Sequence, residues 1–113
     1  RISQNILWNR LATPGGLAEW FADSVRVNGS LFTFYWDGYP SVTELVELNP
    51  PFLIRFRWLE ENADTYFEFK LHKIELTGSL MLEITDFAEA GEKEQTIILW
   101  NTQIKTLKRK LGL

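Results

Sequence analysis

His72 is the only histidine of the chain, and imidazole is the side chain that most readily acts as a base or a metal ligand near neutral pH. Glu68 and Lys70 precede it at two-residue spacing, so all three lie on one charged face of a strand. A metal site needs several His, Cys or carboxylate groups at ligand spacing, and none converge here. We interpret His72 as a surface residue and predict no metal site.

Two further stretches carry residue types that can bind ions. Glu60, Glu61 and Asp64 form an acidic turn, which we interpret as a solvated loop rather than a cation site. Gly15-Gly16 opens a helix as a phosphate-binding loop would, but the lysine and the Ser or Thr of such a loop are absent, so a helix cap explains it better. The chain has no cysteine, and its Ser and Thr residues lack an adjacent base. We therefore predict no catalytic residues and no cofactor.

Length and charge narrow the classes of protein. The 113 residues suffice for one domain with its own core, and 45% of them are apolar. The net charge of −3 argues against a nucleic-acid partner, because proteins of that class carry a basic face. No apolar run approaches the roughly 20 residues that span a bilayer, so we predict no membrane insertion. The lack of cysteine fits a reducing compartment, and we predict a cytoplasmic location.

The beginning of the chain predicts two short helices followed by adjacent aromatic rings. Ser3 can cap a helix over 4–12, and Thr13 can cap a second helix with a proline at its first position. Each of the two glycines that follow costs a helix about 1 kcal/mol relative to Ala. Their presence indicates a close backbone approach or a segment that must shift. Trp20 and Phe21 come directly afterwards and need a buried place.

From Val25 to Asp86 apolar and polar residues alternate with a period of two, which is typical of strands with one buried face. Asn28-Gly29 and Asp37-Gly38 are strong signals for tight hairpin turns. Because the turns are short, the strands form an antiparallel meander. We predict about six strands, the first from Val25 and the others over 31–36, 43–48, 52–58, 65–76 and 80–86.

A long amphipathic helix over 95–111 completes the predicted fold. Its apolar face has three- and four-residue spacing and consists of Ile97, Trp100, Ile104, Leu107 and Leu111. The apolar faces of the strands need a cover, and this helix is the one long amphipathic element. The sequence therefore predicts an α+β fold in which a curved antiparallel sheet grips the C-terminal helix, while Trp20 and Phe21 close the open end.

The stretches TPGGLAEWFAD, FTFYWDG and IRFRW, together with the terminal helix, resemble the START-like (SRPBCC, helix-grip) superfamily, which includes the birch-pollen-allergen fold. The likeness is greatest to bacterial START-like proteins and to the activators of a heat-shock-chaperone ATPase. It covers residues 1–113 as one domain. Its most specific parts are Thr13 to Phe21 and Ile84 to Glu89, and neither is a catalytic signature.

The resemblance implies seven strands, the first of which precedes the first helix. Only Arg1 and Ile2 remain of that strand here, so we expect an N-terminally incomplete domain. A missing strand leaves an unpaired sheet edge that can pair with another chain. A homodimer formed across this edge is therefore a hypothesis.

The resemblance also implies non-catalytic binding of a small apolar or amphipathic ligand between sheet and terminal helix. Relatives with cyclase or hydratase activity need polar groups inside the cavity, and this sequence places few there, so we predict no enzyme activity. We expect a small cavity, because the rings that line the fold also fill it. The candidate lining residues are Trp20, Phe34, Trp36, Phe56, Trp58, Phe69, Leu82, Trp100 and Ile104.

An alternative hypothesis is a protein-interaction module of the chaperone-ATPase-activator type, with a protein partner and no ligand. It predicts an exposed apolar patch or groove around the two short helices. The basic end of the last helix, over 105–110, could meet an acidic partner or a lipid head group. Compensation of the helix dipole and solubility explain these residues more simply.

Overall fold

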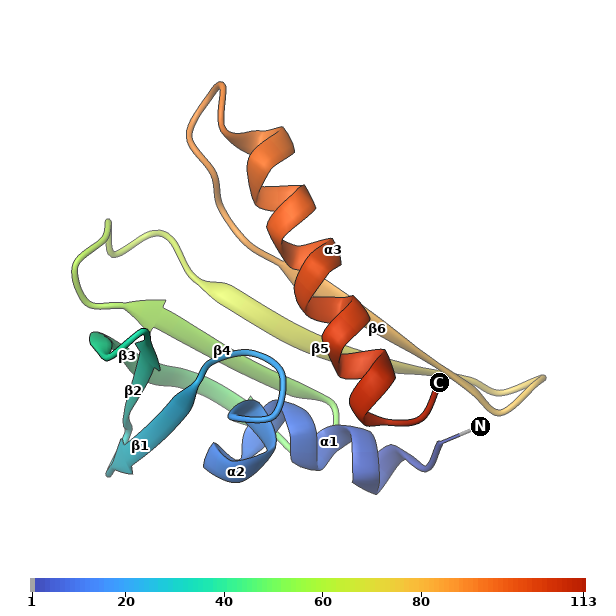
Figure 1. Cartoon of the computed structure of the whole chain (residues 1–113). Helices are drawn as coiled ribbons and strands as arrows, with labels where there is room; N and C mark the ends of the chain where they lie inside the picture. Colours follow the sequence, from blue (N-terminus) through green and yellow to red (C-terminus); the bar gives the residue numbers. More distant parts are fainter. Residues whose placement is uncertain (1) are drawn as a thin grey trace.

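The computed structural model describes residues 2–113 and has an open, curved, six-stranded sheet with two short helices before it and one long helix after it (Figure 1). Arg1, which was assigned to a remnant strand, lies outside the described residues, and Ile2 is not in a strand. The predicted α+β class is confirmed. The elements are α1 (Gln4–Ala12), α2 (Pro14–Leu17), β1 (Ser24–Asn28), β2 (Leu31–Trp36), β3 (Tyr39–Asn49), β4 (Leu53–Trp58), β5 (Phe67–Ile74), β6 (Ser79–Thr85) and α3 (Lys93–Lys110).

The strands form an antiparallel meander in the order β1-β2-β3-β4-β5-β6. Asp37 and Gly38 both have positive φ angles, as a two-residue turn of type I′ requires, and they join β2 to β3 as predicted. The strand β3 begins at Tyr39 rather than at Thr43, because its pairing with β2 extends down to the turn. Within the described chain β1 and β6 are the edges of the sheet, so β6 pairs with β5 alone.

The two faces of the sheet differ as the alternation predicts. Phe34, Phe56 and Phe69 have 0% of their surface exposed, and they lie on the face that turns toward α3. Arg55 and Glu68 lie opposite each other in the ladder on the other face. The ring-bearing face is therefore the inner face of the curved sheet, and burial of its aromatic surface drives its packing.

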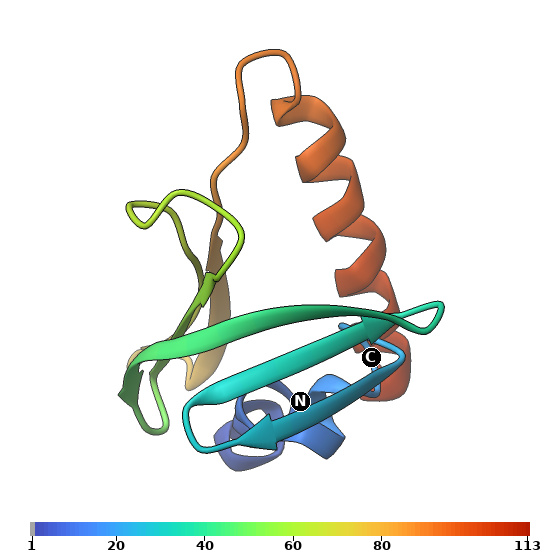
Figure 2. The same ribbon diagram turned by 90° about the vertical axis from the view of Figure 1, so that its left-hand side faces the viewer.

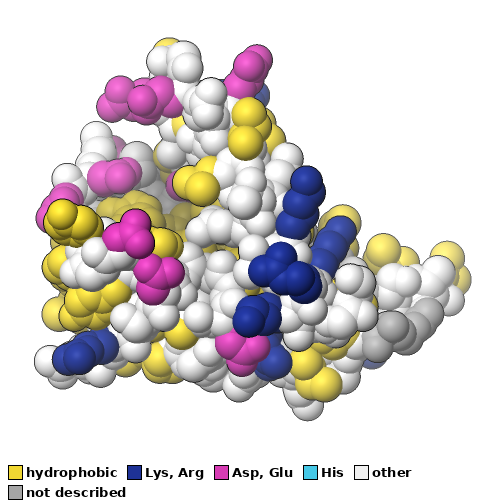
Figure 3. Space-filling view, in the orientation of Figure 1, with side chains coloured by type: hydrophobic (Ala, Val, Ile, Leu, Met, Phe, Trp, Pro, Cys, Tyr) yellow, Lys and Arg dark blue, Asp and Glu magenta, His cyan; other side chains and the backbone are white. Residues whose placement is uncertain are grey.

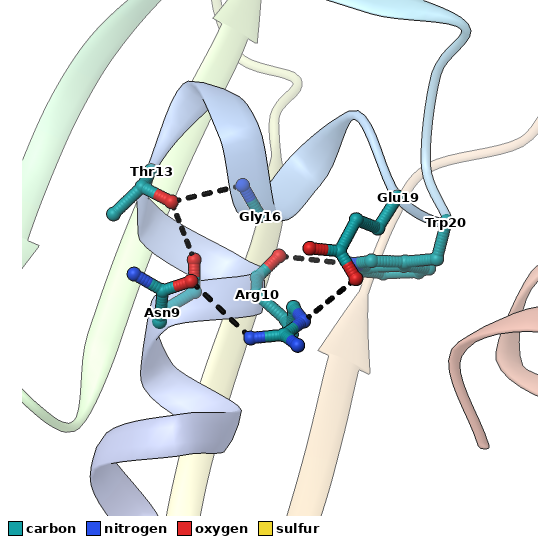
Figure 4. A network of polar contacts seen from close by, with 6 residues as sticks. All are labelled: Asn9, Arg10, Thr13, Gly16, Glu19 and Trp20. Atoms are coloured by element: carbon teal, nitrogen blue, oxygen red, sulfur yellow. Dashed lines mark hydrogen bonds and ion pairs between the residues drawn. The ribbon is translucent and has the colours of Figure 1, made fainter. Parts of the chain in front are cut away.

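Gly16 allows α1 and α2 to approach each other closely (Figure 4). A Cβ atom at Gly16 would collide with the backbone oxygen of Asn9, whereas a Cβ at Gly15 would meet open space. Thr13 joins the two helices, because its Oγ1 accepts a 3.0 Å bond from the Gly16 N–H and donates a 2.8 Å bond to the Asn9 carbonyl. Of the two explanations for the glycine pair, the close backbone approach is confirmed at Gly16.

Trp20 lies against the same helix pair. Its indole Nε1 donates a 2.8 Å hydrogen bond to the carbonyl of Arg10, and Figure 4 shows this bond beside the ion pair of Arg10 with Glu19. The ring is 5% exposed, because its polar edge has a partner and its apolar surface packs on Phe69. Trp20 thus closes the end of the curved sheet as expected.

The ring of Phe21 lies between the sheet and α3. Its ring lies 4.9 Å from the ring of Phe34 and 5.7 Å from that of Trp100. Its carbonyl oxygen accepts two hydrogen bonds, from Trp36 Nε1 at 2.9 Å and from Gln103 Nε2 at 3.0 Å. Phe21, which follows α2, therefore connects β2 with α3, and its ring separates the helix from the sheet.

The helix α3 is packed along only part of its length. Leu107 is its one buried residue within the described chain, and Figures 1 and 2 show its first half extending beyond the strands, beside the β6–α3 loop. It begins at Lys93, two residues earlier than predicted. Among the described residues, no helix is long and apolar enough to span a bilayer.

Candidate ligand groove between β6 and the C-terminal helix

An open groove of about 1170 Å³ lies between the edge strand β6 and α3. Its volume somewhat exceeds the range of roughly 300–1,000 Å³ that small-molecule sites occupy. Apolar side chains form both walls of the groove. The walls consist of Leu80, Leu82 and Ile84 from β6, of Ile97, Trp100, Ile104 and Leu107 from α3, and of Leu111 directly after α3.

The groove lies beside the aromatic core because of a change in side-chain size along the sheet. The inner faces of β2, β4 and β5 carry phenylalanine rings that reach one another, as in the 5.0 Å contact of Phe56 with Phe67. The inner face of β6 carries leucine and isoleucine instead, for example Leu82 opposite Leu71 of β5. The ring of Phe21 holds α3 away from the sheet, and these shorter side chains do not fill the space between β6 and the helix.

Trp100 stands at the boundary between the core and the groove. One side of its ring packs on Phe69 at 5.8 Å, while the residue also lines the groove. Its indole Nε1 donates a 2.9 Å bond to Oδ2 of Asp86, the first residue after β6. This bond ties the middle of α3 to the end of β6 and so holds the two walls together.

The charged residues of the groove lie toward its two ends, while Thr96 and Asn101 are polar residues of the α3 wall. Asp86, Glu89 and Lys93 line the end at the β6–α3 loop, which is the top of Figure 1. Lys108 lines the opposite end, beside Leu113. Apolar side chains form most of the stretch between the ends. The arrangement can hold an elongated apolar molecule whose polar part lies at one end.

The structure divides the nine candidate lining residues into two groups. Leu82, Trp100 and Ile104 lie in the groove. The other six lie in the aromatic cluster and contact one another there: Trp20, Phe34, Trp36, Phe56, Trp58 and Phe69. The volume also differs from the small cavity that we expected. The small cavity was expected because aromatic rings would fill the fold, whereas the inner face of β6 carries the shorter side chains of Leu80, Leu82 and Ile84.

Several groove residues were missed as candidate lining residues. Leu80 and Ile84 alternate in step with Leu82, so the period of two along the strand placed them on the inner face. Ile97, Leu107 and Leu111 belong to the same helical stripe as Trp100, so the helical spacing indicated them as well. Asp86, Glu89, Lys93 and Lys108 gave no such signal, because charged residues at the ends of elements occur on most surfaces. Their position depends on how α3 leans.

The polar residues of the outer sheet face pair with one another. Nη2 of Arg55 lies 2.7 Å from Oε1 of the buried Glu68, and this hydrogen-bonded pairing raises the pKa of Arg55 against the opposing effect of burial. His72 pairs with Glu83 at 2.7 Å on the same face, as its place in the alternation predicts. Across residues 2–113, no three His, Asp or Glu side chains lie close enough together to hold a metal ion.

Three solved structures are similar to the chain. The solution structure of BfR322 from Bacteroides fragilis is 42% identical, covers 98% of this chain and 83% of that one, and has a TM-score of 0.66. The Aha1 dimer from Colwellia psychrerythraea is 17% identical and covers 94% of this chain and 85% of that one, with a TM-score of 0.74. MLL2253 from Mesorhizobium loti is 20% identical, covering 96% and 88%, with a TM-score of 0.74.

These similarities agree on the fold. At 17% and 20% identity the last two structures bear on the fold alone. No curated protein matches the chain significantly. The family model of the START-like superfamily domain matches residues 1–113, which is the whole sequence. With the curved meander, the two short helices and the long terminal helix in place, the chain belongs to the START-like superfamily.

Proposed function

We propose that this domain binds a small hydrophobic or amphipathic molecule, without catalysis, in the groove between β6 and α3. The observation that carries the proposal is the groove itself, whose volume of about 1170 Å³ is lined largely by aliphatic side chains and by Trp100. Burial of an apolar molecule there would release water from both walls. START-like domains are mostly non-catalytic binding domains, which agrees with this proposal.

The wall residues suit a ligand that is mostly hydrocarbon. Leu82 and Ile104 are half-buried, so each retains apolar surface that a ligand can cover. Trp100 supplies a flat ring and also an optical signal, because its fluorescence responds to the polarity of its surroundings. Of the nine candidate lining residues, we assign these three to the ligand and the other six to the packed core.

A titration with N-phenyl-1-naphthylamine, a neutral apolar fluorescent probe, tests the proposal. We expect saturable binding by the wild-type protein and a loss of about tenfold in affinity for Leu82→Asn, since the substitution places an amide on the apolar wall. Leu76→Asn is the matched control, because Leu76 is 99% exposed and lies outside the groove. Binding that is absent, or that responds equally to both variants, would contradict the proposal.

A second candidate function is a protein-interaction module, including a homodimer, and two observations favour it. The outer edge of β6 has no strand beside it within the described chain. Ile98 and Leu99 on α3 are 56% and 59% exposed, although both are large and apolar. One similar structure is that of a dimer of Aha1. Both features belong to β6 and α3 rather than to α1 and α2.

Light scattering coupled to size exclusion, carried out over a dilution series, tests this candidate. A concentration-dependent dimer that Ile98→Asp abolishes would support self-association through α3. A monomer at every concentration would remove the homodimer. For another partner, affinity capture should yield one protein in stoichiometric amount with the wild type and none with Ile98→Asp, and recovery of no such protein would exclude the candidate.

A further inference from the structure

The two ends of the groove differ in charge. At the upper end Asp86 and Glu89 outnumber Lys93, so that this end has a net negative charge. At the lower end Lys108 is the one charged side chain among the described residues that line the groove. A ligand with one polar end would therefore have a preferred direction.

Among the described residues, Lys108 has no acidic partner. None of the ion pairs within residues 2–113 involves it, and its side chain is exposed at the end of the groove. Lys105, Arg109 and Lys110 lie around it on the last turns of α3. Figure 3 shows Lys and Arg side chains gathered over the lower half of the helix, and acidic side chains near the top of the molecule. The potential at the lower end is therefore positive, and one amine of this cluster lies on the rim of the groove.

The apolar part of the groove begins directly beside Lys108. Leu107 and Ile104 precede it on the same wall, followed by Trp100 and Ile97 one and two turns further up. From Ile97 to Lys108 the helix rises about 16 Å, at 1.5 Å per residue. One extended acyl chain fits along this stretch, with its head group at the lysine.

We propose that the groove selects single-chain amphiphiles with an anionic head group, such as a free fatty acid, and that Lys108 binds the head. This inference rests on the proposed function and adds the class of ligand and its direction. A carboxylate at Lys108 forms a charge-assisted hydrogen bond, and Asp86 and Glu89 disfavour the reverse orientation. The lysine acts as the specificity residue, while the aliphatic walls supply most of the affinity.

Three probes share one alkyl chain and differ in the head group: dodecanoate, dodecanol and dodecyltrimethylammonium. Titrating each as a monomer by calorimetry separates the contribution of the head group to the affinity from that of the alkyl chain. We expect dodecanoate to bind about tenfold more tightly than dodecanol, a difference of about 1.4 kcal/mol, and the cation to bind most weakly. Lys108→Gln should remove the preference for dodecanoate over dodecanol. Lys105→Gln, one turn away and outside the groove lining, is the matched control and should keep the preference.

Each other result has a distinct meaning. Equal binding of dodecanoate and dodecanol overturns the assignment of Lys108 and leaves the proposed function intact. An equal effect of the two lysine substitutions overturns it as well, since diffuse surface charge would then explain the preference. Binding to anionic phospholipid vesicles without binding of monomeric dodecanoate assigns the cations to a membrane surface and overturns the inference. If none of the probes binds, the proposed function and this inference both fail.

Discussion

The indole of Trp100 donates a 2.9 Å hydrogen bond to the carboxylate of Asp86, and this bond connects the two walls of the groove across the β6–α3 loop. The same ring packs on Phe21 and Phe69 of the core. Trp100 therefore couples the position of α3 both to the aromatic cluster and to the end of β6.

Trp100→Phe should lower the free energy of unfolding by about 1 kcal/mol, because it removes the indole donor and retains an aromatic ring. Asp86→Asn keeps an oxygen that can accept the bond and should cost less. Denaturant unfolding of both variants measures the difference. No loss for Trp100→Phe would mean that the bond contributes nothing to holding α3, and equal losses for the two variants would mean that the amide oxygen does not replace the carboxylate as acceptor.

The two adjacent glycines of α2 should respond to substitution in opposite directions. Gly16→Ala should destabilise the protein by about 1–3 kcal/mol, since its methyl group would collide with the backbone of Asn9. Gly15→Ala should be neutral or stabilising by up to about 1 kcal/mol, because its methyl group meets open space within a helix. Thermal unfolding of the pair provides the measurement, and similar transition temperatures for the two variants would contradict the close approach.

On the outer sheet face, Glu68→Gln should cost about 1–3 kcal/mol, because the side chain of Glu68 is only 6% exposed and the change removes the charge that Arg55 pairs with. Glu83→Gln should cost less than about 1 kcal/mol, since its pair with His72 is largely exposed. Urea titrations at neutral pH compare the two. A Glu83 variant that loses as much as the Glu68 variant would refute this ranking.

Phe69→Ala should lower the free energy of unfolding by about 3–5 kcal/mol, because a completely buried ring is replaced by a cavity. Leu76→Ala, at a side chain that is 99% exposed, should change it by less than about 0.5 kcal/mol. Chemical denaturation followed by far-UV circular dichroism distinguishes them. A small loss for Phe69→Ala would place the core elsewhere.

Much of the fold was predictable because the signals are local. The caps at Ser3 and Thr13, the Asp37-Gly38 turn and the period of two along the strands each depend on residues close in sequence. The inward direction of the phenylalanine rings followed from alternation alone. Arg55 and Glu68 lie on the charged face of neighbouring strands, as the alternation indicates, and they form an ion pair there.

The groove was less predictable, because it depends on the distance between α3 and the sheet. That distance is determined by Phe21, which contacts β2, β5 and α3 at once, and no periodicity in the sequence encodes such a contact. Trp100 and Ile104 were identified from the helical stripe, but Phe34 and Phe56 carry the same inward signal and lie in a filled core. Alternation indicates which face is inside without indicating whether space remains there.

Solution NMR of the protein titrated with dodecanoate tests the ligand groove most directly. The account predicts that the methyl signals of Leu82, Ile84 and Ile104 and the indole signal of Trp100 shift together and saturate, while the ring signals of Phe34 and Phe56 stay in place. Shifts confined to the outer sheet face, around His72 and Glu83, or the absence of saturable shifts at the groove residues, would contradict it.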